Sequence, residues 1–116
     1  MKKQVVRKSV KSVEVQVDVV LLKEGEFFVA LCPSLNLSSY GHTEKEAKAA
    51  FDEALHIFID DTDRKGSLEK ELLKNGWILQ HYPSISYKPP KLSVFPNANS
   101  FKGSKSKFKE KIAFPL

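Results

Sequence analysis

A capped amphipathic helix is the sequence feature that most restricts what this chain can fold into. Thr43 stands before the first apolar helical position, and Glu46 follows three residues later. This is the pattern of a capping box: the Thr43 hydroxyl accepts from the Glu46 amide, and the Glu46 carboxylate accepts from the Thr43 amide. Gly41, just ahead, permits a sharp turn. The apolar residues that follow have the spacing of one helical face: Ala47, Ala50, Phe51, Ala54, Leu55, Phe58 and Ile59.

Three short strands are predicted ahead of this helix. Residues 13–22 begin with alternating apolar and polar side chains, which is typical of a half-buried strand. Glu24 and Gly25 are predicted to form a tight hairpin turn, because Gly25 can supply a positive φ. Residues 26–32 are almost wholly apolar, as in a central strand. Pro33 ends that strand, since proline cannot donate to a strand ladder, and residues 35–40 alternate again as a third strand.

The segment after the long helix predicts a second helix and a further strand. A polar break over residues 60–66 ends the long helix, and Ser67 caps a short helix over residues 68–74 that an Asn-Gly pair closes. Residues 77–82 are expected to form a fourth strand or an extended packing segment. We therefore expect an α+β fold: a small three- to four-stranded, antiparallel-rich sheet with one long helix packed on a face, in the order β-β-β-α-α-β.

The charge distribution divides the chain into three parts. The net charge is +5, but an acidic middle lies between two basic ends. We expect a basic N-terminal arm over residues 1–12, a folded domain over residues 13–82 and a tail over residues 83–116. Prolines and lysines are so frequent in this tail that no regular element is expected there.

The expected compartment is the cytoplasm. No apolar run approaches the ~20 residues that span a membrane, and the basic start lacks the apolar middle of a signal peptide. Cys32 is the only cysteine, so a disulfide within the chain is impossible. Its place at the end of an apolar run favours a buried strand residue over a reactive thiol.

The sequence contains no complete catalytic or metal-binding pattern, and we expect neither a catalytic residue nor a metal or other cofactor. A calcium loop that started at Asp61 would place Lys65 and Leu72 at positions that need oxygen ligands. The histidines lack the spacing of a zinc helix. A metal-dependent nuclease would need Asp18 and a helix carboxylate, Glu53 or Asp60, to face each other across the core.

Part of the chain, roughly residues 15–80, resembles the HicB family of antitoxins. The resemblance is carried by a proline loop, a Gly-x-Thr cap and a Glu-Ala helix: Phe28, Ala30, Pro33, Leu35, Gly41, Thr43, Glu46, Ala47, Ala54 and Leu55. It implies a partial ribonuclease H-like fold and a role in binding and neutralising a small basic HicA-type toxin that cleaves mRNA. Ser34 departs from the acidic residue that often follows the loop proline, and the tail replaces the DNA-binding module of many members.

Two partner-binding surfaces remain open for such a role. One is the polar side of the long helix, with Asp52, Glu53, Asp60 and Asp61, because an acidic surface attracts a basic toxin. The other is the exposed side of the sheet. Uncovered sheet edges also make a homodimer or higher oligomer plausible.

The alternative hypothesis is nucleic-acid binding through the basic ends. Lysines interleaved with aromatic residues can bind single strands by charge and stacking. The candidate residues are Phe101, Lys102, Lys105, Lys107, Phe108 and Lys109.

Overall fold

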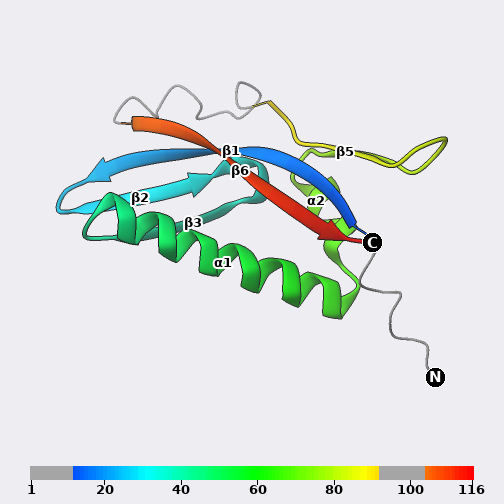
Figure 1. The fold of residues 1–116 in the computed structure, drawn as a ribbon, viewed down its shortest axis with the longest axis horizontal. Helices are drawn as coiled ribbons and strands as arrows, with labels where there is room; N and C mark the ends of the chain where they lie inside the picture. Colours follow the sequence, from blue (N-terminus) through cyan, green and yellow to red (C-terminus); the bar gives the residue numbers. More distant parts are fainter. Residues whose placement is uncertain (1–11, 92–103) are drawn as a thin grey trace.

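Four antiparallel strands form the main sheet, in the order β3-β2-β1-β6 (Figure 1). The structure is a computed structural model, and it describes residues 12–91 and 104–116. The strands are β1 (Ser12–Glu24), β2 (Phe27–Cys32), β3 (Leu37–Gly41) and β6 (Ser104–Pro115). The predicted α+β class and the helix-on-sheet arrangement are confirmed, although the fourth strand of the main sheet comes from an unexpected segment.

The hairpin between β1 and β2 lies one residue beyond its predicted place. Glu24 pairs with Phe27, so the two loop residues are Gly25 and Glu26. Gly25 has a φ of 62°, a left-handed conformation that glycine adopts without steric cost. After β2, the single 3-10 turn η3 (Pro33–Leu35) leads into β3.

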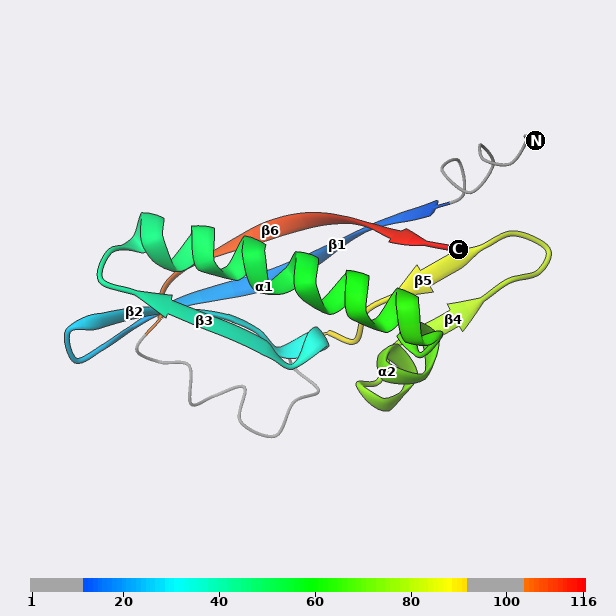
Figure 2. The same ribbon diagram turned by 90° about the horizontal axis from the view of Figure 1, so that it is seen from below.

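The long helix α1 (Glu44–Lys65) covers one face of the sheet (Figure 2). The Thr43 hydroxyl accepts a hydrogen bond from the Glu46 amide at 3.0 Å, as predicted. The Glu46 carboxylate, however, accepts from the amide of His42 at 2.9 Å and not from that of Thr43. Gly41 is required here, because a Cβ at this position would lie 2.6 Å from Cβ of Glu46 and 2.8 Å from the Ala47 nitrogen.

The predicted break over residues 60–66 is wrong, because α1 continues to Lys65. Thr62 is buried, and its hydroxyl donates to the carbonyl oxygen of Phe58 at 2.8 Å. The helix ends at Gly66, whose φ is 67°. The Ser67 amide donates back to the Thr62 carbonyl oxygen at 2.9 Å, which satisfies a carbonyl that the helix end would leave unpaired.

A short helix and a small sheet follow the C-terminal end of α1. They are α2 (Leu68–Lys74) and a two-stranded sheet of β4 (Ile78–Gln80) and β5 (Ser86–Lys88). The predicted second helix is confirmed, but the Ser67 side chain makes no capping hydrogen bond. The predicted fourth strand, residues 77–82, is shorter and pairs only with β5 in this separate sheet.

The expectation that residues 83–116 contain no regular element is wrong for β5 and β6. β6 pairs antiparallel with β1 from Ser12↔Pro115 to Leu22↔Ser104, with one irregularity near Leu21. Proline is tolerated at Pro115 because it lies at the end of an edge strand. Ile112 and Phe114 are buried in the core. The last described residues are therefore part of the domain and not a tail outside it.

The core lies between α1 and the sheet and continues under α2. The predicted apolar face of α1 points into it, with Ala47, Phe51 and Leu55 buried and the other predicted members half-buried. The remaining buried members of the cluster come from the strands, from η3 and from the segment that follows α1: Val15, Val17, Val19, Leu21, Ala30, Cys32, Leu35, Leu68, Leu72, Trp77, Tyr87, Ile112 and Phe114.

Candidate functional site

The polar side of α1 forms an acidic surface that faces away from the sheet. We call it the acidic helix face and define it by Asp52, Glu53, Ile57, Asp60 and Asp61. All of its members are exposed except Asp61, which is half-buried. The structure therefore places the four predicted partner-binding carboxylates on one side of one helix.

Only the C-terminal half of the acidic helix face is neutralised from within α1. The Arg64 guanidinium lies 3.4 Å from the Asp60 carboxylate and 3.7 Å from that of Asp61. The Lys65 ammonium lies 3.1 Å from the Asp61 carboxylate. In the part of the chain that the structure describes, Glu53 has no such ion pair, so its charge is available to a partner.

Ile57 is an apolar side chain in the middle of this acidic surface, and the sequence analysis did not select it. Its side chain is 64% exposed. Glu53 precedes it by four residues and Asp60 follows by three, so the three side chains are neighbours on the helix surface. In the sequence, Ile57 could have been noticed as an apolar residue that lies outside the apolar face of the helix. A single exposed apolar side chain is common on protein surfaces, so Ile57 is informative here only through its acidic neighbours.

Glu110 of β6 extends the acidic helix face onto the edge of the sheet. Its register partner is Val17, so its side chain lies on the face of the sheet that carries α1. Burial raises the pKa of the Glu110 carboxyl, and a hydrogen bond with Asp52 and the charge of Asp52 raise it further. The charge of His56 acts in the opposite direction. Two carboxyl groups from distant parts of the chain thus meet beside a histidine.

The opposite face of the sheet, which we call the outer face, carries lysines. Lys107, Lys109 and Lys111 of β6 pair with Val20, Asp18 and Gln16 of β1. Their side chains therefore project away from α1 and are exposed. The Lys109 ammonium lies 2.8 Å from the Asp18 carboxylate.

The predicted nucleic-acid residues do not form one surface. Phe108 is half-buried against the core on the α1 side, and the Lys48 ammonium lies 4.8 Å from its ring centroid. Lys107 and Lys109 lie on the outer face instead, so Phe108 cannot stack a base beside them. Phe101 and Lys102 lie outside the described residues, as does the side chain of Lys105.

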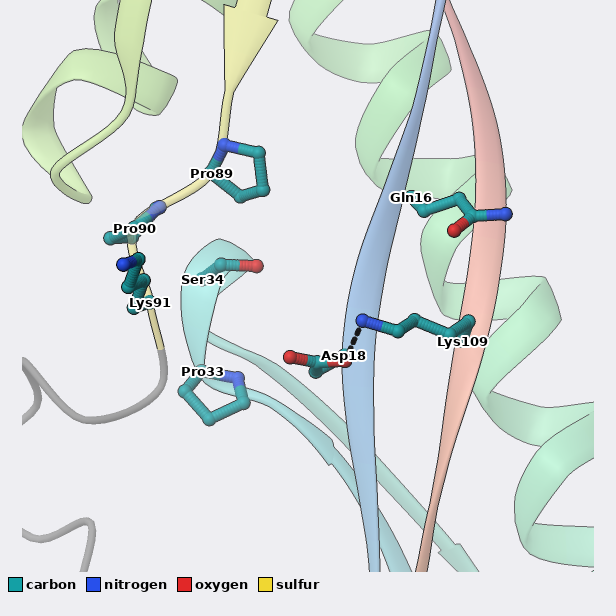
Figure 3. A pocket seen from close by; sticks show the side chains of 8 residues that line it. All are labelled: Gln16, Asp18, Pro33, Ser34, Pro89, Pro90, Lys91 and Lys109. Atoms are coloured by element: carbon teal, nitrogen blue, oxygen red, sulfur yellow. Dashed lines mark ion pairs between the residues drawn. The ribbon is translucent and has the colours of Figure 1, made fainter.

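A hollow of about 140 Å³ lies on the outer face between β1, η3 and the segment after β5 (Figure 3). Its polar lining includes Gln16, Ser34 and the Asp18–Lys109 ion pair, and Pro33 of the predicted loop motif forms part of its wall. Ser34 is nearly buried, and its carbonyl oxygen accepts from the Trp77 indole at 2.7 Å. The loop proline thus has a structural place beside an anchored turn.

Asp18 and the helix carboxylates Glu53 and Asp60 lie on opposite sides of the sheet. Asp18 lines the outer face, whereas Glu53 and Asp60 project from α1 into solvent. The facing arrangement that a metal-dependent nuclease would need is therefore not formed by these residues. Among residues 12–91 and 104–116, no three His, Cys, Asp or Glu side chains gather where they could hold a metal ion.

A further polar cluster fastens the β4–β5 sheet to α2. The Tyr87 hydroxyl donates to the Glu69 carboxylate at 2.6 Å, and the same oxygen lies 2.9 Å from Nε2 of His81. The hydrogen bond from Tyr87, followed by that from His81, lowers the pKa of Glu69. Burial raises the pKa of the Tyr87 hydroxyl, and the Glu69 carboxylate adds to that effect. Each group is satisfied within the cluster, which therefore acts as a structural clamp.

The buried thiol of Cys32 has no catalytic surroundings. Its side chain is 0% exposed, and Sγ lies 3.4 Å from the Ser34 hydroxyl. Burial raises the pKa of the thiol, so the nucleophilic thiolate is disfavoured. The predicted buried strand residue is confirmed.

Comparison of the chain with protein-family models, with curated protein sequences and with solved structures gives no match. Across the described ranges, none of the helices combines the length and apolar content that crossing a membrane requires.

Proposed function

We propose that this protein acts as an antitoxin-like binder, and not as an enzyme, by holding a small basic HicA-type toxin against the acidic helix face. The observation that carries the proposal is the combination of exposed Glu53 and Asp60 with the exposed apolar side chain of Ile57 on one helix. Such a surface offers both charge complementarity and a desolvated contact to a basic protein. The role also places the protein in the cytoplasm, where mRNA is cut.

To neutralise the toxin, this protein must compete with RNA for the toxin's basic surface, and the charge of the acidic helix face supports that competition. A toxin that cleaves RNA must present cations to phosphates, and an acidic surface competes for the same cations. Opposite charge mainly raises the association rate. Ile57 then supplies apolar contact that remains when salt screens the charges.

The rigidity of α1 favours the same role. The helix is capped at Thr43 by a side-chain hydrogen bond and at Gly66 by backbone bonds, and its apolar face is packed on the sheet. A partner therefore meets a preformed surface, and little ordering entropy opposes binding. A two-fold assembly through an uncovered sheet edge remains a prediction of the sequence.

The test is co-purification with the product of a neighbouring short basic reading frame that carries a catalytic histidine. We expect a complex that survives physiological salt. The variant E53Q/I57S/D60N should weaken it about tenfold or more, because it removes both charge and the central apolar contact.

A matched control is E14Q/E24Q/L73S. It removes two exposed carboxylates and one exposed apolar side chain from other surfaces, so its net charge equals that of the test variant. We expect the control to retain the complex. Equal weakening by both variants, or no association of the native proteins, would contradict the proposal.

A further inference from the structure

A groove lined by lysines lies at the far end of the outer face. It measures about 670 Å³, and its lining includes Ile78, Pro89 and Pro90. Three lysines line it: Lys74 of α2, Lys88 at the end of β5, and Lys91. No acidic side chain of the described residues lines this groove. We call it the lysine groove.

The Lys-Pro-Pro-Lys sequence explains how two of these lysines come to line one groove. Proline fixes φ near −65° and forces the residue before it into an extended conformation. Prolines favour the polyproline II helix, whose three residues per turn place side chains three residues apart on the same side. Lys88 and Lys91 have this spacing. Neither has an ion-pair partner among the described residues, whereas Lys74 lies 3.7 Å from Glu71 on the surface.

The lysine groove is continuous with the lysines of β6. It shares Pro89, Pro90 and Lys91 with the hollow that Lys109 lines (Figure 3). That hollow shares Gln16 with a third hollow, of about 180 Å³, which Glu14 and Lys111 line. A row of three depressions therefore runs along one side of the molecule.

The chemistry of this row fits a polyanion with apolar parts. A strand rises about 3.4 Å per residue, so Lys107 and Lys111 lie about 14 Å apart along β6 and can meet two separate phosphates of an extended chain. Lys109 forms an ion pair with Asp18, so its charge contributes less to binding a phosphate. The apolar residues that line the lysine groove, with exposed Ile78 among them, offer a surface on which a base can lie.

We infer that the outer face binds single-stranded nucleic acid, with phosphates on Lys74, Lys88, Lys91, Lys107 and Lys111 and a base against Ile78. α1, on the other side of the sheet, carries the opposite charge and directs a polyanion to this face. The inference differs from nucleic-acid binding by a basic tail without regular structure. Four of its five lysines lie within residues 83–116, but they come from β5, the segment just after it and β6, and the fifth, Lys74, comes from α2.

The test is fluorescence anisotropy of a labelled oligouridylate of about 15 nucleotides, a length in the range of single-strand sites, against the full chain in a salt series. Five phosphate contacts predict that log K falls with log salt with a slope of about −3.5, since each contact on a single strand contributes about −0.7. Removing three contacts in K74Q/K88Q/K91Q should leave a slope of about −1.4. The control K45Q/R64Q/K65Q loses the same charge from α1 and should retain the native slope.

Two further measurements separate nucleic acid from other anions. Ile78→Ser should weaken binding of the oligonucleotide and leave the salt slope unchanged, because Ile78 is 69% exposed and contacts no phosphate. An oligoglutamate of equal charge should bind at least tenfold more weakly than the oligonucleotide. The inference is overturned if the lysine variant and its control behave alike, if Ile78→Ser has no effect, or if oligoglutamate binds equally well.

The E53Q/I57S/D60N variant should still bind the oligonucleotide, so failure of the proposed toxin binding is distinguishable from failure of oligonucleotide binding.

Discussion

The two sides of the main sheet differ in their charged side chains, and the comparison between them explains how the chain is organised. α1, which carries the acidic helix face, lies against one side of the sheet (Figure 1), and Lys109 projects on the other (Figure 3). The register of β6 places Lys107 and Lys111 on that second side too, and the lysine groove adjoins it. In the sequence these charges are separated along the chain, with an acidic middle and a basic end. Pairing of β6 with β1 converts this separation along the chain into a separation between faces.

β6 joins these two sides because its alternate residues serve both. Phe108, Ile112 and Phe114 point toward α1 and the core, whereas Lys107, Lys109 and Lys111 point outward. The same strand is therefore structural on one side and a candidate binding surface on the other.

Phe114→Ala should lower the free energy of unfolding by about 3–5 kcal/mol, the usual cost of deleting a buried phenylalanine. Phe114 is fully buried, and its ring meets that of Trp77 edge-on at 5.6 Å. The neighbouring Lys111→Gln should change stability by less than about 0.5 kcal/mol, as is usual at exposed sites. Urea unfolding measures both. A small effect of Phe114→Ala would show that β6 is dispensable and would remove the basis of the comparison.

The acidic helix face requires that α1 is formed, and the cap at Thr43 stabilises the start of this helix. Removing the cap should have an intermediate effect on the free energy of unfolding. Thr43→Ala should cost about 1 kcal/mol, because the Thr43 hydroxyl caps the Glu46 amide. Ser67→Ala at the start of α2 is the matched control. Since the Ser67 side chain makes no capping hydrogen bond, its loss should cost clearly less. Thermal or urea unfolding of the two variants tests this order, and the reverse order would contradict the described helix ends.

Glu110 lies on the edge strand β6, beside Asp52 of α1. Changing it should have the smallest effect on the free energy of unfolding, and that effect should depend on pH. Because the pKa of Glu110 is raised from its ordinary 4.5 in the folded state, the unfolded chain releases this proton first as pH rises. Stability from this group is therefore fully present below about pH 4.5 and is lost as pH rises through the folded-state pKa. Glu110→Gln should match the native protein at acid pH and exceed its stability at neutral pH. Urea midpoints across this range measure the difference, and a constant difference at all pH values would contradict the contact with Asp52.

Elements with a strong local pattern were predictable from the sequence. The cap at Thr43, the apolar face of α1 and the alternation of β1 each depend on residues close together in the chain. The errors within these elements are shifts of one or a few residues, as with His42 in place of Thr43 as donor to Glu46. α1 passes its predicted end because Thr62 is buried and hydrogen-bonds back to the helix, which composition alone does not indicate.

Long-range features were missed because no local pattern specifies a partner. The period-two alternation of Phe108, Ile112 and Phe114 with lysines was present in the sequence. It was interpreted as basic groups with aromatics for stacking, because only pairing with β1 reveals that these aromatic rings point inward. The meeting of Glu110 with Asp52 and the lysine groove depend on the same pairing and on the placement of the segment after β5.

The candidate site was predictable in part. Four carboxylates on the polar side of α1 follow from helical spacing, and the structure brings them to one surface. Ile57 was not selected, since an isolated apolar residue on a polar helix side is common. Its exposure and its acidic neighbours become informative only once the helix is placed on the sheet.

Isoleucine methyl NMR of the full chain tests the two-sided account most directly, because Ile57 lies on the acidic helix face and Ile78 lies in the lysine groove. The account predicts that a HicA-type toxin shifts or broadens the Ile57 signal and leaves that of Ile78 unchanged. Oligouridylate should do the reverse. A toxin that perturbs Ile78 and not Ile57 would contradict the central claim that the acidic side of α1 holds the basic partner.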